Sequence, residues 1–148
     1  MTLKERLQKE LVEAMRARDT LKVDVIRLLR NSIRQKEIEL KKELSDDDVI
    51  KILSNAAKQR RESIKAYEAG KREDLVEREK RELDIIESYL PEKLPQEELI
   101  KIVEDVIKEV GASSLRDLGK VMPKVMAKVK GRADGSEVQA IVRSKLVG

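Results

Sequence analysis

The chain has 148 residues, a net charge of +4, 42% charged residues and 1% aromatic residues. It contains no cysteine and no histidine, which excludes a disulfide framework, a cysteine nucleophile and a histidine general base. Since Trp and Phe are also absent, the core must consist of Leu, Ile, Val, Ala and Met, and such a core favours helices packed on helices.

Four helices are predicted in the first part of the chain, at about residues 2–17, 20–42, 45–70 and 73–88. Thr2 and Glu5 have the spacing of a capping box, and Thr20 is the predicted N-cap of the second helix. Ser45 begins the third helix, where the run Asp46-Asp47-Asp48 suits the positive end of the helix dipole. A metal site at these aspartates is the alternative interpretation, but a helix start explains them without a metal.

The segment Tyr89-Leu90-Pro91-Glu92-Lys93-Leu94-Pro95 separates two parts of the chain, because its prolines end a helix and fix an extended segment. We therefore predict an N-terminal helical domain at residues 1–90 and a C-terminal helical domain at residues 91–148. The second domain has predicted helices at about residues 95–110, 114–130 and 136–146. No β pattern is present, so we predict an all-α protein with a four-helix domain followed by a small three-helix domain.

Residues 116–132 differ from the rest of the chain, because they include six Lys or Arg residues and a single acid, Asp117. Four of the cations recur every four residues, which places them on one face of a helix. The apolar residues of another face are Leu115, Leu118, Met122, Val125 and Val129. The predicted contacts to a nucleic acid are Arg116, Lys120, Lys124, Lys128, Lys130 and Arg132. Gly131 and Gly135 are predicted to form the turns that place them.

Pro123 lies inside this predicted helix, and an interior proline removes a backbone hydrogen bond, so we expect a kink or a break near residues 119–123. From the residues alone, the basic face is either a solvated surface or a nucleic-acid contact. A second basic cluster on the third helix has glutamates close by, which favours a solvated, ion-paired face. Its members are Lys58, Arg60, Arg61 and Lys65.

No catalytic residue, metal ligand or cofactor site is predicted. The chain has neither a GxxxxGK[ST] phosphate loop nor a GxGxxG pattern, and its serines show no recognisable pairing with a base. No apolar run approaches the roughly 20 residues of a membrane span, and the N-terminus lacks the apolar segment of a signal peptide. With the absence of cysteine, these features predict a cytoplasmic protein without membrane contact.

Three segments together resemble the YqeY family of the GatB/YqeY superfamily. The first is Gln59-Arg60-Arg61-Glu62-Ser63, and the second is Ser88-Tyr89-Leu90-Pro91. The third combines GKVM at residues 119–122 with KGRADG at residues 130–135. The resemblance covers essentially the whole chain. Pro123 departs from it, since a smaller residue that is compatible with a helix is expected at this position.

The resemblance implies two helical domains, of which the C-terminal one is similar to the tail of the B subunit of the glutamine-dependent tRNA amidotransferase. It implies tRNA as the ligand of the basic face and, by analogy alone, carbon–nitrogen ligase activity with glutamine as amido donor. A tRNA-holding module without its own active site is the function that we predict. The alternative is an adaptor that docks an amidotransferase or an aminoacyl-tRNA synthetase through its N-terminal helices.

Overall fold

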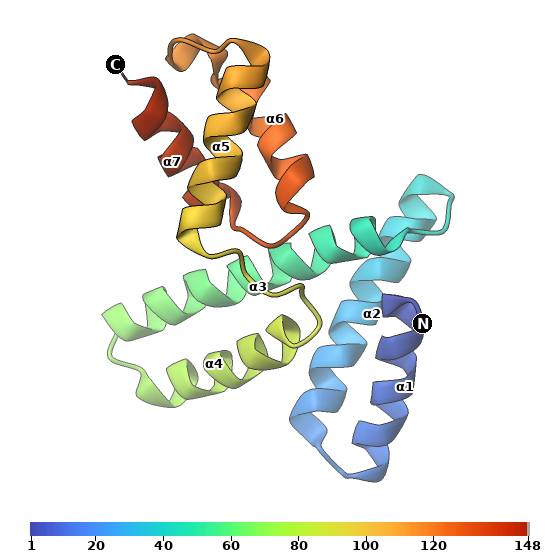
Figure 1. Ribbon diagram of the computed structural model, residues 1–148. Coiled ribbons are helices and arrows are strands. Elements are labelled where there is room, and N and C mark those ends of the chain that lie inside the picture. The colour runs from blue at the N-terminus through green and yellow to red at the C-terminus, as the bar shows by residue number, and fades with distance from the viewer. Residues whose placement is uncertain (148) are drawn as a thin grey trace. The chain divides into compact units, whose positions relative to one another are not determined.

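The structure is a computed structural model that describes residues 1–147, and within this range it is all-α, without strands (Figure 1). This confirms the predicted fold class. Contacts between Cα atoms divide the chain into two compact units, Met1–Leu90 and Pro91–Gly148. That each unit folds as a separate domain stays a prediction. Among residues 1–147, no helix combines the length and the apolar character that crossing a membrane requires.

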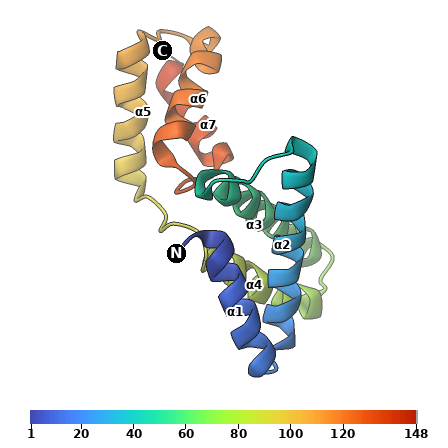
Figure 2. The same cartoon turned by 90° about the vertical axis from the view of Figure 1, so that its right-hand side faces the viewer.

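The first unit consists of two antiparallel helical hairpins, α1 with α2 and α3 with α4 (Figures 1 and 2). The helices are α1 Leu3–Arg16, α2 Thr20–Leu40, α3 Asp46–Ala69 and α4 Glu73–Glu87. The predicted N-cap of α2 was wrong by one residue. Asp19 is the cap, because its carboxylate accepts a hydrogen bond from the Lys22 amide at 3.2 Å, and Thr20 is already helical.

The three consecutive aspartates begin α3, as predicted. Ser45 and Asp48 form a reciprocal capping box, in which each side chain accepts a hydrogen bond from the other residue's amide. Asp46 Oδ1 accepts a hydrogen bond from the Leu3 amide at 3.0 Å. This run of acids therefore caps its own helix and also fixes the start of α1 against it.

The second unit is a three-helix arrangement of α5 Gln96–Val110, α6 Leu118–Val129 and α7 Gly135–Leu146, in which every helix contacts the other two. Its core is aliphatic and rich in valine, and Val103, Val106 and Val142 have no exposed surface. Asp134 is the N-cap of α7 and accepts a hydrogen bond from the Ser136 amide at 3.3 Å. The sequence pattern of Ser136 and Gln139 also resembles a capping box, but Ser136 lies inside the helix and is not its cap.

Pro123 neither breaks α6 nor ends it, since the helix runs without interruption through this residue. Of the two expected outcomes, the break is excluded, and the bend stays a prediction. Pro123 is exposed and lies in the second turn of α6, so the backbone hydrogen bond that it cannot donate is missing near the start of the helix. A 3-10 turn, Leu115–Asp117, precedes α6, and a capping box between Ser114 and Asp117 closes this turn.

Candidate nucleic-acid interface

The lysines of α6 lie outside the face of the helix that packs on the core. Val121, Val125 and Val129 have no exposed surface, and each follows one of the lysines by a single position. The side chains of Lys120, Lys124 and Lys128 are 74%, 53% and 48% exposed, respectively. The helix therefore buries its valines and presents its lysines, one turn apart, to solvent.

The apolar face of α6 differs from the predicted one. Val121, which the predicted seam omits, is fully buried, whereas Leu115 is 44% exposed. The reason is that Leu115 belongs to the 3-10 turn before α6, so that the helical period begins only at Leu118. Leu118 and Met122 are partly buried at the edge of the core.

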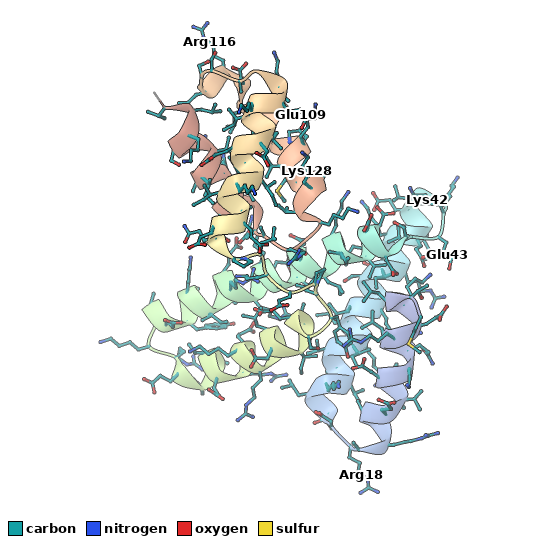
Figure 3. All side chains as sticks on the ribbon, viewed as in Figure 1. Arg18, Lys42, Glu43, Glu109, Arg116 and Lys128 are labelled. Carbon is teal, nitrogen blue, oxygen red and sulfur yellow. The ribbon has the colours of Figure 1, made fainter. Side chains whose placement is uncertain are left out.

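Lys120, Lys124 and Lys128 form what we call the lysine row. Glu109 of α5 pairs with two of them, Lys124 and Lys128 (Figure 3). The Nζ atom of Lys128 lies 3.2 Å from one Glu109 oxygen, and that of Lys124 lies 3.7 Å from the other. The hydrogen bond from Lys128 lowers the pKa of Glu109. Sequence reasoning missed this acid, because it lies on another helix. The two lysines thus share one carboxylate, which neutralises them only in part.

Lys120 has a weaker acidic neighbour. Its Nζ atom lies 3.9 Å from Asp117 Oδ1. The other oxygen of Asp117 accepts hydrogen bonds from the amides of Ser113 and Ser114, at 2.9 and 3.3 Å, and these bonds lower the pKa of Asp117. Because Asp117 is engaged chiefly in the backbone turn, Lys120 remains available to an external anion.

Arg116 and Lys130 flank the row and have no ion-pair partner among residues 1–147. Arg116 projects into solvent from the 3-10 turn (Figure 3). Lys130 ends α6 in the left-handed conformation, with φ of 45°, and Gly131 follows with φ of 78°. Gly131 thus provides the predicted turn. Gly135 does not, because it is the first residue of α7, and an added Cβ would lie 3.9 Å from Met126, an ordinary contact.

Arg132 has a structural contact that its predicted role did not include. Its Nε donates a 2.8 Å hydrogen bond to the Glu92 carbonyl, and its own carbonyl accepts one from the Leu94 amide at 2.9 Å. These bonds hold the extended segment before α5 against the turn after α6. A guanidinium has five N–H donors, so this contact leaves others for a ligand.

The second basic cluster is ion-paired at its two arginines, as predicted, but Arg60 is only 17% exposed, so the expected solvated face does not extend to it. Arg60 of α3 lies 3.0 Å from Glu82 and 3.6 Å from Glu79, both on α4. Arg61 lies 3.6 Å from Glu87. These contacts join α3 to α4, so the arginines of this cluster contribute to the packing of the hairpin.

The chain matches the family described as "Yqey-like protein" over residues 4–146. It is similar to "Altered inheritance of mitochondria protein 41, mitochondrial" of Pyrenophora tritici-repentis, with 30% identity over 97% of this chain and 80% of the relative. The protein of the same name from Vanderwaltozyma polyspora is 35% identical over 76% of this chain and 64% of the relative. For Saccharomyces cerevisiae strain YJM789 the identity is 36%, over 72% of this chain and 57% of the relative.

The matched part therefore spans about three fifths of the two yeast relatives. All three relatives are mitochondrial by name, and this finding contradicts the prediction of a cytoplasmic protein. Low apolar content at the N-terminus and the absence of cysteine are weak indicators of a compartment, which explains the error. With nearly its whole length matched, the chain belongs to the YqeY family.

Proposed function

We propose that this protein holds tRNA by its phosphate backbone, through the basic face of α6, and has no active site of its own. The basic face comprises Arg116, Lys120, Lys124, Lys128, Lys130 and Arg132. The observation that carries the proposal is the row of three exposed lysines, each of which directly precedes a fully buried valine of the same helix. Because the buried side fixes the helix, the Cα atoms of the three lysines are held one turn apart along α6.

The carboxylates beside the row are compatible with an anionic ligand. Glu109 is 51% exposed, and its pairs with Lys124 and Lys128 are therefore solvent-screened. Ion pairs of this kind contribute about 0–1 kcal/mol, so an RNA phosphate can replace them at little cost. The basic face thus has six positive charges, and its ion-pair partners are two carboxylates, Glu109 and Asp117.

The composition of the second unit indicates what kind of contact forms. Both tyrosines of the chain, Tyr67 and Tyr89, belong to the first unit, so the basic face offers no aromatic ring on which a base can stack. Contacts to phosphates give affinity that depends strongly on salt and weakly on sequence. The resemblance to the tail of the tRNA amidotransferase B subunit supports tRNA as the ligand.

A binding titration with unfractionated tRNA tests this proposal. The variant Lys120→Glu/Lys124→Glu/Lys128→Glu should bind at least ten-fold more weakly than the unmodified protein, because each lost phosphate contact removes a favourable charge interaction. The matched control changes three lysines of the first unit, Lys9→Glu/Lys58→Glu/Lys65→Glu, and has the same net charge. Equal losses of affinity in the two variants, with folding verified by circular dichroism, would refute the proposal.

An adaptor role is the second candidate, and exposed apolar side chains on α2 favour it. Leu28, Ile38 and Leu40 are 47%, 67% and 44% exposed, which suits a helix that docks a partner subunit. The proposed partner is an amidotransferase or an aminoacyl-tRNA synthetase. Co-purification with and without ribonuclease separates the two functions, since a protein partner that persists after ribonuclease treatment supports the adaptor. Glutamine-dependent ammonia release by the isolated chain would contradict a module without an active site.

A further inference from the structure

A row of three arginines lies on α2, far in sequence from the basic face of α6. Arg27, Arg30 and Arg34 are all exposed, and their spacing of three and four residues places them on one side of the helix. Residues 27–36 include these arginines and Lys36 but no acid. We name Arg27, Arg30 and Arg34 the arginine row.

The arginine row differs from the arginines of α3 and α4. Each arginine of α3 and α4 has a carboxylate partner, at distances of 3.0–3.6 Å for Arg60, Arg61, Arg78 and Arg81. None of the three members of the row has an ion pair or a hydrogen-bonding side-chain partner within residues 1–147. Like charges three or four residues apart destabilise a helix by a few tenths of a kcal/mol, and no ion pair of these arginines within residues 1–147 offsets this repulsion.

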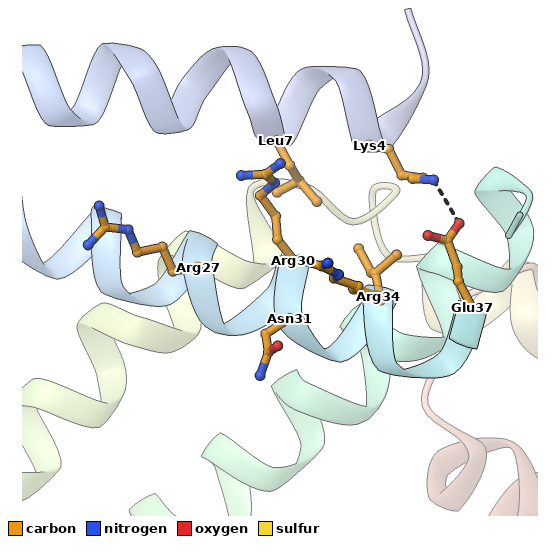
Figure 4. Close-up of a pocket in the computed structure, with 8 residues that line it drawn as sticks. Lys4, Leu7, Arg27, Arg30, Asn31, Arg34 and Glu37 are labelled. Atoms are coloured by element: carbon orange, nitrogen blue, oxygen red, sulfur yellow. Dashed lines mark hydrogen bonds and ion pairs between the residues drawn. The ribbon is translucent and has the colours of Figure 1, made fainter. Parts of the chain in front are cut away.

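The arginine row borders a groove of about 470 Å³ between α1 and α2 (Figure 4). Leu7 and Ile33, which are almost fully buried, form its apolar floor. In Figure 4 the side chain of Arg30 rises toward Leu7, while Lys4 and Glu37 meet at one end of the groove. The groove thus combines a neutral floor with a rim of guanidinium groups.

Glu37 is the one carboxylate that lines this groove, and it is already engaged. Lys4 Nζ lies 2.7 Å from Glu37 Oε2, and the Leu44 amide donates a 2.9 Å hydrogen bond to the same oxygen. The hydrogen bond from Lys4 lowers the pKa of Glu37 and that from Leu44 adds to the effect. The carboxylate therefore does not compete for the arginines, and the rim retains its positive charge.

The dimensions of the row match a strand of phosphates. Residues 27–34 extend about 10 Å along the helix axis, at about 1.5 Å per residue. The three guanidinium groups lie about one helical turn apart at the ends of long side chains, so each can reach a separate phosphate of a strand that runs along α2. A planar guanidinium group can donate two parallel hydrogen bonds to two oxygens of one phosphate, and this geometry favours phosphate over simple anions. An open groove bordered by exposed side chains suits an extended strand, and it has no aromatic ring for a base.

We propose that the arginine row on α2 is a second RNA-backbone site, which binds about three consecutive phosphates along the groove between α1 and α2. This site extends the proposed function to the first unit and rests on it only in the choice of RNA as the ligand. The two sites belong to different units and use different residues. Each can therefore be tested while the other is intact.

The test measures the affinity of the full-length protein for fluorescently labelled, unfractionated tRNA over a series of salt concentrations. The row variant is Arg27→Gln/Arg30→Gln/Arg34→Gln. The matched control, Arg72→Gln/Arg78→Gln/Arg81→Gln, removes the same charge from exposed arginines that have carboxylate partners. The row variant should lower the slope of log K against log salt by about 2, at about 0.7 per lost phosphate contact. The control should leave this slope unchanged.

The variant Lys120→Glu/Lys124→Glu/Lys128→Glu of α6, measured over the same salt series, separates this proposal from the proposed function of α6. A reduced slope in the row variant alone supports the second site and overturns the proposed role of α6. A reduced slope in the α6 variant alone, with the row variant equal to its control, overturns the second site. Absence of tRNA binding by the unmodified protein overturns both. A lower melting temperature of the row variant would assign a structural role to the arginines, because the loss of like-charge repulsion should leave this temperature equal or raise it.

Discussion

The Tyr89 hydroxyl donates a 3.0 Å hydrogen bond to the carboxylate of Glu10, which lies 79 positions earlier in the chain. Arg6 completes the arrangement, with its Nε 2.7 Å from the other Glu10 oxygen and its guanidinium carbon 4.7 Å from the centre of the Tyr89 ring. Arg6 also donates a hydrogen bond to the Ser88 carbonyl at 3.1 Å. These contacts fix the end of α4 against α1 immediately before Pro91, where the first unit ends. The Tyr-Leu-Pro motif thus has a structural role.

The substitution Tyr89→Phe should lower the free energy of unfolding by about 1–2 kcal/mol, because it removes a hydrogen bond to a charged group at a buried position. Urea denaturation followed by circular dichroism measures this change. Tyr67→Phe is the matched control, since the Tyr67 hydroxyl makes no hydrogen bond within residues 1–147 and should cost nothing measurable. Similar losses in the two variants would show that the bond to Glu10 is unimportant.

The same cluster predicts a dependence of stability on pH. Burial raises the pKa of Glu10, but the hydrogen bonds from Arg6 and Tyr89 outweigh it, so the pKa in the folded protein lies below its ordinary value of 4.5. A carboxyl group of this kind stabilises the fold above its unfolded pKa, and the contribution disappears as the pH falls through the folded pKa.

The stability difference between the unmodified protein and Glu10→Gln should therefore be largest near neutral pH and shrink below about pH 4.5. Urea titrations of both proteins at a series of pH values provide the measurement. A difference that stays constant down to about pH 3 would mean that the Glu10 charge contributes nothing.

The two glycines near the end of α6 should respond differently to alanine. Gly131→Ala should cost about 1–2 kcal/mol, because φ of 78° is strained for a residue with a Cβ atom. Gly135→Ala should be neutral or stabilising, since this position is helical and its Cβ would meet only an ordinary contact. Thermal unfolding of the two variants distinguishes them. If Gly135→Ala were the more destabilised variant, the assignment of the turn to Gly131 would be wrong.

Contacts between residues close in sequence could be predicted, because a fixed spacing along a helix determines them. The capping boxes at Ser45 and Ser114 are examples, and the lysine row follows from a repeat of four residues. The pair of Glu109 with Lys128 could not be predicted, since it joins two helices across 19 positions. The bond from Arg132 to the Glu92 carbonyl spans 40 positions and depends equally on tertiary structure.

For the arginine row, too, the contacts with other helices could not be predicted from the sequence. The spacing of Arg27, Arg30 and Arg34 is visible in the sequence, but the sequence does not show whether acids of other helices reach them. Arg60 and Arg61 have glutamates near them in the sequence, yet each is paired with a glutamate of another helix, α4. Only the packing of the helices separates a structural arginine from one that is available to a ligand.

Chemical labelling of lysine amines, followed by mass spectrometry, tests the central claim most directly. Lys120, Lys124 and Lys128 are all exposed and should react readily in the free protein. With saturating tRNA at low salt, their labelling should fall several-fold, while that of Lys58 and Lys65 on α3 should stay the same. Unchanged labelling of the three lysines of α6 in the presence of bound tRNA would contradict the account.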